Sequence, residues 1–360
     1  MKHLLVHNIR PGMKIGKDVY GSNNLLLLPR GTMVTNPIIT NLLFHDVISV
    51  FIDDTEPVSD NNLMNIESLQ EEINIKETKE FKMFERRHKE TLACVQDEFS
   101  NIIDSKSPVD TEVLFLQVAN LFPSDMSNIS LFDMLHHMRE YDDSTYVHCI
   151  SVALICNAFG RWLHLSPDEL KVLTLCGLLH DIGKLKIPNE IIKKPGKLSD
   201  EEYEIVKKHP YFGYKILSKQ KNLDPRIAQA ALLHHERCDG YGYPMGFHRS
   251  SIADYALIVA IADVYDAMTS ARVYREPLCP FTVIKYLEIE SMQRFDPLYF
   301  MTFNEQILTS YINTEVKLSN GKIAKVVYIN RNDLSHPIVK IGKECIDLSV
   351  KKDIEIVAMV

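Results

Sequence analysis

The feature that most constrains this chain is a long region, from about residue 110 to residue 310, in which apolar side chains recur with helical spacing. Several segments there begin with helix-start signals, such as Ser166 before Pro167 and Ser199 three residues before Glu202. We therefore expect an all-helical central region. Its predicted helices are residues 111–121, 131–140, 146–163, 167–179, 200–217, 225–235 and 254–269.

Both ends of the chain have a different pattern, in which short β-like runs alternate with turn residues. Near the N-terminus such runs lie at residues 24–28 and 47–52. Near the C-terminus they lie at residues 316–318, 323–329, 338–341 and 354–360, with Ser319-Asn320-Gly321 as a hairpin turn. The fold class expected is mainly α, a helical bundle with small β-rich appendages at both ends.

The predicted organisation has four parts. They are a β-rich domain (1–55), a helical linker (56–125), the main helical domain (126–310) and a β-rich appendage (311–360). Within the linker, residues 63–103 contain no Pro or Gly and many Glu and Lys. Two interpretations stay open: a solvated connecting helix, or a helix that forms a homodimer or transmits a signal. The apolar spacing is not a clean heptad, so it supports a parallel coiled coil only weakly.

Composition and net charge argue against several classes of protein. A net charge of −8 argues against binding to duplex nucleic acid, which needs a positive field. No window approaches 18 uncharged apolar residues, so we expect no membrane span. The seven cysteines are odd in number and contain no CxxC pair, which is typical of reduced thiols in the cytoplasm.

A set of histidines and aspartates lies inside apolar helical segments. Asp263, for example, follows the run Ile-Val-Ala-Ile-Ala, where a carboxylate is costly unless it is paired or binds a metal. Taken singly, each member has an ordinary explanation, such as a hydrogen-bonded core histidine or a solvated helix end. Together they indicate one shared polynuclear metal site. The set is His148, His180, Asp181, His209, His234, His235 and Asp263.

The sequence around these residues resembles the HD-GYP domain, a subgroup of the HD metal-dependent phosphohydrolases. The resemblance covers residues 142–275. It rests on the His-Asp-Ile-Gly-Lys motif at 180–184, on the HHExxDGxGYP string at 234–244, and on the Ala-Asp-Val-Tyr-Asp-Ala stretch at 262–267. It implies a helical bundle whose two or three metal ions are usually iron or manganese. It also implies hydrolysis of cyclic di-GMP, or of a mixed GMP–AMP ring, to the linear dinucleotide or on to GMP.

Site residues follow from the resemblance position by position. One ion would be held by His148, His180, Asp181 and Asp263. The second would be held by Asp181, His209, His234 and His235, so Asp181 would bridge the two. Asp181 and Lys184 are the expected catalytic residues, and Lys184, Tyr243, Arg272 and Arg275 are the expected substrate-binding residues. Glu236 and Asp266 are expected to orient the ligands.

One position departs from the family pattern. Members with a third metal carry a glutamate four residues before the first histidine, and this chain has Ser144 there. We therefore expect a dinuclear centre and a linear pGpG product, with the second step to GMP in doubt. The rival interpretation is a catalytically silent receptor, in which the same pocket binds a cyclic dinucleotide and the flanking domains respond.

Overall fold

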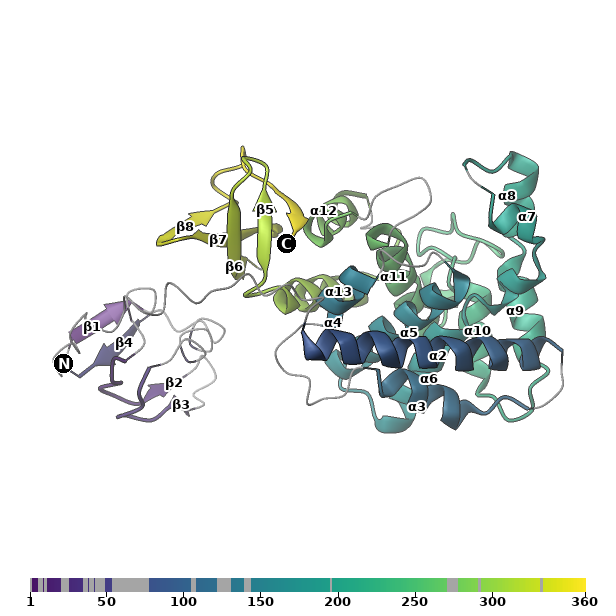
Figure 1. The fold of residues 1–360 in the computed structure, drawn as a ribbon, viewed down its shortest axis with the longest axis horizontal. Helices are drawn as coiled ribbons and strands as arrows, with labels where there is room; N and C mark the ends of the chain where they lie inside the picture. The colour runs from purple at the N-terminus through teal and green to yellow at the C-terminus, as the bar shows by residue number, and fades with distance from the viewer. Residues whose placement is uncertain are drawn as a thin grey trace. The chain divides into compact units, whose positions relative to one another are not determined.

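The computed structural model, drawn in Figure 1, describes most of the helical region and parts of both ends. The described residues are 2–5, 9, 12–20, 26–34, 38, 42, 49–53, 78–104, 108–121, 131–138, 144–194, 196–270, 278–290, 293–330 and 333–360. By its internal contacts the chain divides into two compact units, residues 1–73 and residues 74–360.

The first unit is small and β-rich. Strand β1 (Lys2–Leu5) pairs antiparallel with β4 (Ser49–Ile52), and β2 (Val19–Tyr20) pairs antiparallel with β3 (Leu26–Leu28). Ile15, Val34 and Leu42 are almost fully buried in its own hydrophobic core.

Helices make up most of the second unit, as the apolar spacing predicts. They are α2 (Lys79–Ile103), α3 (Thr111–Ala119), α4 (Leu131–Met138), α5 (Thr145–Trp162), α6 (Pro167–Leu179), α7 (Asn189–Ile192), α8 (Asp200–Val206), α9 (His209–Leu217), α10 (Pro225–Leu233), α11 (Asp254–Thr269), α12 (Pro280–Glu290) and α13 (Pro297–Ser310). Among the described residues, the 3₁₀ helices η4 (Ile182–Lys186) and η5 (Arg249–Ser251) lie between them.

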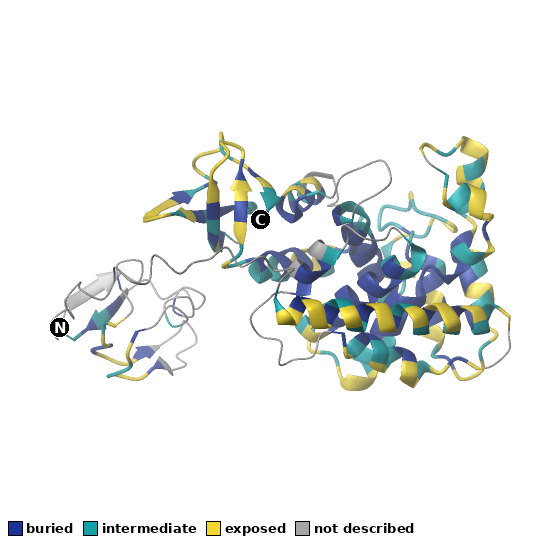
Figure 2. Ribbon diagram, viewed as in Figure 1, coloured by how far each residue is buried: buried dark blue, intermediate teal, exposed yellow. Residues whose placement is uncertain are grey.

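Helices α5, α6 and α11 form the centre of the bundle. They pack against one another and are buried along most of their length, as the dark blue ribbon in Figure 2 shows. A helix that is apolar on all sides is typical of such a position. A polar side chain in the buried stretches of these helices is therefore surrounded by protein.

The segment predicted as a single helix over residues 200–217 is two helices. Helix α8 ends at Val206, and α9 begins at His209 with Pro210 in its first turn. Proline has no N–H to donate, and its ring clashes with the carbonyl four residues earlier, which is that of Val206. The break separates the two helices immediately before His209.

Helix α2 packs as a member of the bundle. Its side chains Phe84, Val95 and Phe99 are fully buried in the same hydrophobic core as α5 and α6. Over residues 79–103, the segment predicted as a linker is thus a packed element with one exposed face. The four-part division of the chain and a homodimer through this segment stay predictions.

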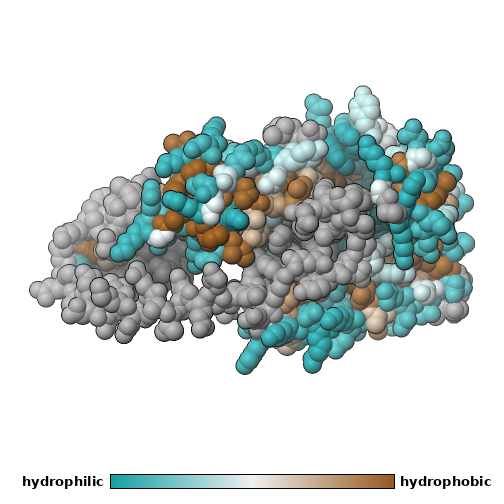
Figure 3. Space-filling model, turned by 45° about the horizontal axis from the view of Figure 1, so that its top comes forward, coloured by the Kyte–Doolittle hydropathy of each residue, from teal (hydrophilic) through white to brown (hydrophobic). Residues whose placement is uncertain are grey.

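A five-stranded antiparallel sheet follows the bundle in the order β8-β7-β6-β5-β9. Its strands are β5 (Glu315–Leu318), β6 (Ile323–Asn330), β7 (Asp333–Ile341), β8 (Glu344–Asp347) and β9 (Ile356–Met359). The predicted hairpin turn is present, with Gly321 at φ +82°. Strand β8 was not predicted; it pairs with β7 next to Gly342, whose φ of +56° suits a tight turn. Figure 3 shows hydrophobic side chains among hydrophilic ones on this appendage.

The predicted fold class is confirmed: a mainly helical protein with small β elements at both ends. Over the part of the chain that the structure describes, no helix combines the length and apolar character that a bilayer crossing requires.

Candidate metal centre

The structure brings together all seven residues that the sequence predicts as metal ligands. His148, His209 and Asp263 lie on helices α5, α9 and α11. The other four follow helix ends, His180 and Asp181 after α6 and His234 and His235 after α10. The ligand atoms form two groups in which every pair lies within 4.8 Å. One group is Asp181, His209, His234 and His235, and the other is His148, His180 and Asp263. One group is the full expected set of the second ion, and the other is the expected set of the first ion without Asp181. Metal coordination by these residues stays a prediction.

Asp181 lies between the groups and faces both. Its Oδ1 is 3.1 Å from Nε2 of His209 and 3.7 Å from Nε2 of His234. Its Oδ2 is 3.4 Å from Nε2 of His180 and 3.6 Å from Nε2 of His148. A carboxylate that presents one oxygen to each group has the arrangement needed to bridge two cations.

Backbone carbonyls orient three of the histidine rings. Nδ1 of His180 lies 2.7 Å from the Gly177 carbonyl, and Nδ1 of His209 lies 2.7 Å from that of Val206. Nδ1 of His234 lies 3.0 Å from a carbonyl one turn earlier. Each bond leaves Nε2 directed at the centre, which is how proteins set the tautomer of a metal-binding histidine.

His148 is oriented by a carboxylate instead. Its Nδ1 is 2.7 Å from Oδ2 of Asp266, and its Nε2 is 3.0 Å from Oδ1 of Asp263. Asp263 and Asp266 lie three residues apart on α11, so one face of that helix presents both carboxylates. Asp266 therefore occupies the orienting position predicted for it.

The ionisation of His234, His235 and Asp181 suits a cation. Burial lowers the pKa of His234 well below its usual range and that of His235 to about 3, so both rings are neutral. Burial alone would raise the pKa of Asp181, but the nearby Lys184 and His180 outweigh it and the pKa lies well below its usual range. Neutral imidazoles and ionised carboxylates are the forms that bind metal ions.

Two buried atoms of the cluster have no hydrogen bond within the described structure. They are Nε2 of His180 and Oδ1 of Asp181. An unpaired buried polar atom costs about 1–3 kcal/mol, so such atoms are rare in folded proteins. A divalent cation would satisfy both, and the nitrogen and oxygen donors fit a transition metal. The site therefore suits divalent metal ions.

Two predicted substrate-binding residues border the centre. Nζ of Lys184 contacts Oδ2 of Asp181, and the ring of Tyr243 stacks on that of His235 with centroids 4.6 Å apart. Arg272 and Arg275 lie outside the described residues.

Glu236 binds the loop that follows it, and its orienting role stays a prediction. Its buried carboxylate accepts three backbone N–H groups of the following loop, those of Met245 at 2.6 Å, Gly246 at 3.2 Å and Phe247 at 2.9 Å. It therefore holds the loop that carries Tyr243. Sequence spacing does not reveal this bond, because it depends on how the loop folds back.

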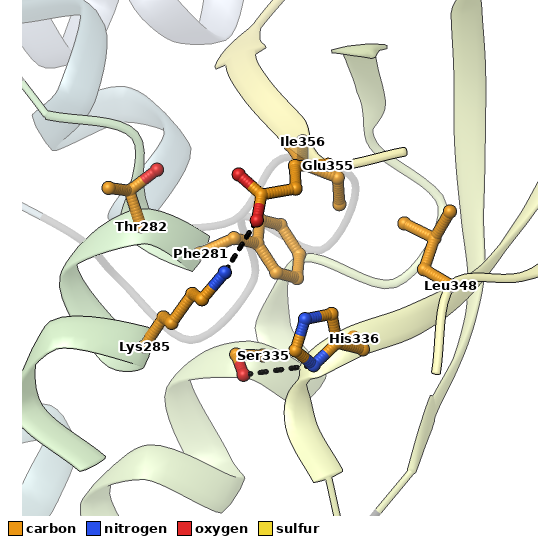
Figure 4. Close-up of a pocket in the computed structure, with 8 residues that line it drawn as sticks. All are labelled: Phe281, Thr282, Lys285, Ser335, His336, Leu348, Glu355 and Ile356. Atoms are coloured by element: carbon orange, nitrogen blue, oxygen red, sulfur yellow. Dashed lines mark hydrogen bonds and ion pairs between the residues drawn. The ribbon is translucent and has the colours of Figure 1, made fainter. Parts of the chain in front are cut away.

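A second hollow lies between α12 and the C-terminal sheet (Figure 4). It contains Ser335 and His336, with Asp333 nearby, but these three do not form a proton relay. Oγ of Ser335 at 3.3 Å and Oδ1 of Asp333 at 2.6 Å both approach the same ring nitrogen, Nδ1 of His336. Lys285 in this hollow is paired with Glu355 at 2.6 Å. The polar groups are thus engaged with one another.

Comparisons with known proteins bear on the helical region. The HD domain family model matches residues 125–298. A curated cyclic di-GMP phosphodiesterase of Pseudomonas aeruginosa is 34% identical over 207 residues, which are 58% of this chain and 50% of the relative. A 3′3′-cGAMP-specific phosphodiesterase of Vibrio cholerae is 38% identical over 157 residues, which are 43% of this chain and 36% of the relative. The chain thus spans half or less of the length of these relatives.

The fold also has a solved counterpart. The structure of an HDG"Y"P protein from Bdellovibrio bacteriovorus aligns with a TM-score of 0.52, at 19% identity, over 85% of this chain and 99% of that chain. At this level of identity the similarity concerns the fold alone.

Proposed function

We propose, from the premise that residues 125–298 are an HD domain of the HD-GYP type, that this chain is a metal-dependent phosphodiesterase that hydrolyses cyclic di-GMP to linear pGpG. The resemblance predicted from the motifs is confirmed for this region. One observation carries the proposal: the two oxygens of Asp181 face two separate groups of histidines in a buried cluster.

The cluster would hold two divalent ions, for which iron and manganese are the proposed metals. His148, His180 and Asp263 would hold one, His209, His234 and His235 the other, and Asp181 would join them. When bound, two such cations neutralise a phosphodiester anion and lower the pKa of a water molecule beside it. Helices α5, α6 and α11 bury the cluster, so its charges act in a medium of low dielectric constant.

Neighbouring side chains would bind the substrate. The ammonium of Lys184 lies against Asp181, where it adds positive charge for a non-bridging phosphate oxygen. Tyr243, stacked on His235, presents an aromatic surface beside the cluster. Arg272 and Arg275 are proposed to grip the phosphates or the bases.

The proposed product is the linear dinucleotide because Ser144 cannot replace a carboxylate ligand. Its side chain caps α5 by accepting the N–H of Val147 at 3.3 Å. We also propose that the protein acts in the cytoplasm, for which the seven free cysteines are the supporting observation.

A mixed GMP–AMP ring is the second candidate substrate, because one relative is named for that activity. The second candidate function is a silent receptor for the same ligands. Both share the binding site, so only turnover and product analysis separate them from the main proposal.

The test is a turnover assay on the full chain purified without oxygen and loaded with Fe(II) or Mn(II). Cyclic di-GMP and the GMP–AMP ring are supplied separately, and products are resolved by chromatography. Asp181→Asn should lose bound metal and turnover, whereas Asp168→Asn, on the exposed start of α6, should retain both. Binding without linear product would favour the receptor, and full activity of Asp181→Asn would contradict a bridging role.

A further inference from the structure

His235 is held differently from the other histidines of the metal-ligand cluster. Backbone carbonyls fix three of those rings through Nδ1, and the carboxylate of Asp266 fixes the ring of His148. Within the described part of the chain, neither ring nitrogen of His235 has a hydrogen bond, and its Nδ1 lies 3.9 Å from Oδ2 of Asp263. The orientation of the His235 ring therefore depends on other contacts.

Tyr243 packs on this ring. The two ring centroids lie 4.6 Å apart and the ring planes are inclined by 30°, which is a stacked arrangement. The backbone N–H of Tyr243 also donates to the carbonyl oxygen of His235 at 3.2 Å, so the backbones of the two residues are joined as well. The other rings against His235 are those of His209 and His234, which belong to the cluster themselves. Among the described residues, Tyr243 thus supplies the ring contact that comes from outside the cluster.

The loop on both sides of Tyr243 is fixed against the backbone that follows His235. Gly242 packs so closely there that a Cβ at this position would lie 2.5 Å from Cα of Glu236. After Tyr243, the carboxylate of Glu236 accepts the backbone N–H groups of residues 245–247. These contacts leave the ring of Tyr243 little freedom to move away from His235.

We infer that Tyr243 is a positioning residue for His235, and that its stacked ring takes the place of the orienting hydrogen bond that the other histidines have. Without the stack, the imidazole is free to rotate about its side-chain bonds, and ordering it on metal binding costs affinity. The second ion is affected, because its expected ligands include His235, whereas those of the first ion do not. This role is separate from any contact of Tyr243 with substrate. The inference rests on the metal centre of the proposed function.

The test measures metal binding with no substrate present. The metal-free full chain is titrated with Mn(II) against a chelator, and the EPR spectrum separates a single bound ion from a coupled pair. Tyr243→Leu should weaken binding of the second ion about threefold to tenfold, the range for a lost aromatic pair, and leave the first ion unchanged. Tyr243→Phe keeps the ring and should bind both ions as the unmodified chain does.

Two further variants complete the design. Tyr241→Leu is the matched control, because it removes a tyrosine of the same loop that is 83% exposed, and it should bind both ions normally. Gly242→Ala keeps the tyrosine but displaces the backbone that carries it, so it should show the same selective loss of the second ion as Tyr243→Leu.

Three results would overturn the inference. Weakening of both ions by the same factor in Tyr243→Leu would show a general structural role. Unchanged binding of both ions would show that Tyr243 does not act on the metal centre, and an equal loss in Tyr243→Phe would show that the ring is not what matters. If the unmodified chain binds fewer than two Mn(II) ions, the proposed metal centre fails and the inference with it. If it binds two and does not cleave cyclic di-GMP, only the proposed activity fails.

Discussion

Replacing Glu236 with glutamine would test whether this residue serves the loop or the metals. Its Oε1 accepts two backbone N–H groups and its Oε2 accepts a third, while the residue is only 3% exposed. A glutamine keeps one acceptor oxygen and turns an NH₂ donor toward an N–H donor. At least one bond to a charged acceptor is lost, which costs about 1.5–3 kcal/mol.

This free energy has a direct readout in hydrogen exchange. A loss of about 1.5–3 kcal/mol corresponds to about tenfold to a hundredfold faster opening. In Glu236→Gln, peptides that cover residues 245–247 should exchange faster by that factor in the metal-loaded full chain, measured by mass spectrometry. The bound metal content should not change.

Glu204→Gln is the matched control. Glu204 is exposed on α8, and its ion pair with Lys207 contributes about 0–1 kcal/mol. Exchange of the 245–247 peptides should be the same in this variant as in the unmodified chain. If Glu236→Gln instead lost metal and kept slow exchange in the loop, Glu236 would act on the ligands and our reasoning would be refuted.

Three further predictions follow from the same geometry. Despite its burial, His148 has a pKa raised to about 9 by Asp263 and Asp266, so metal binding must displace its proton. Between pH 7 and 8.5, the metal affinity measured by competition with a chelator should therefore rise about tenfold per pH unit. An affinity that does not change with pH would contradict this prediction. Asp266→Ala removes the hydrogen bond that orients the His148 ring and should weaken metal binding by about 10–100-fold in the same competition. Asp254→Ala, at the exposed start of α11, should leave metal binding unchanged. Equal affinities of the two variants would argue against an orienting role of Asp266. A Cβ at Gly183 would lie 2.0 Å from a backbone oxygen of α9, so Gly183→Ala should lower the free energy of unfolding by about 3 kcal/mol or more, measured by thermal unfolding. Gly213→Ala, whose new Cβ has its nearest contact at 3.5 Å, should change it by no more than about 1 kcal/mol. Equal melting temperatures of the two variants would disprove the close approach.

Much of the bundle could be predicted from the sequence alone because helix formation depends on residues that are close together in the sequence. Apolar spacing and caps such as Ser166 and Ser199 mark where helices begin. The seven histidines and aspartates were also visible in the sequence, since charged side chains in apolar helices need partners.

Other features depend on contacts between distant segments. The sequence places Asp181 just after α6, but only the packing of the bundle turns one oxygen toward each histidine group. Likewise, the burial of α2 depends on the face it presents to α5, because amphipathic spacing alone does not say whether a partner is present.

The loop after α10 shows most clearly which features the sequence determines and which depend on the tertiary structure. Its motif could be read as a string, and the string was enough to predict the family. Its physical role could not be read, because Glu236 binds backbone N–H groups nine to eleven residues ahead, and Arg294 joins the loop from a turn beyond α12. Local preferences act over a few residues, whereas hydrogen bonds and charges act through space, so only the folded chain brings these partners together.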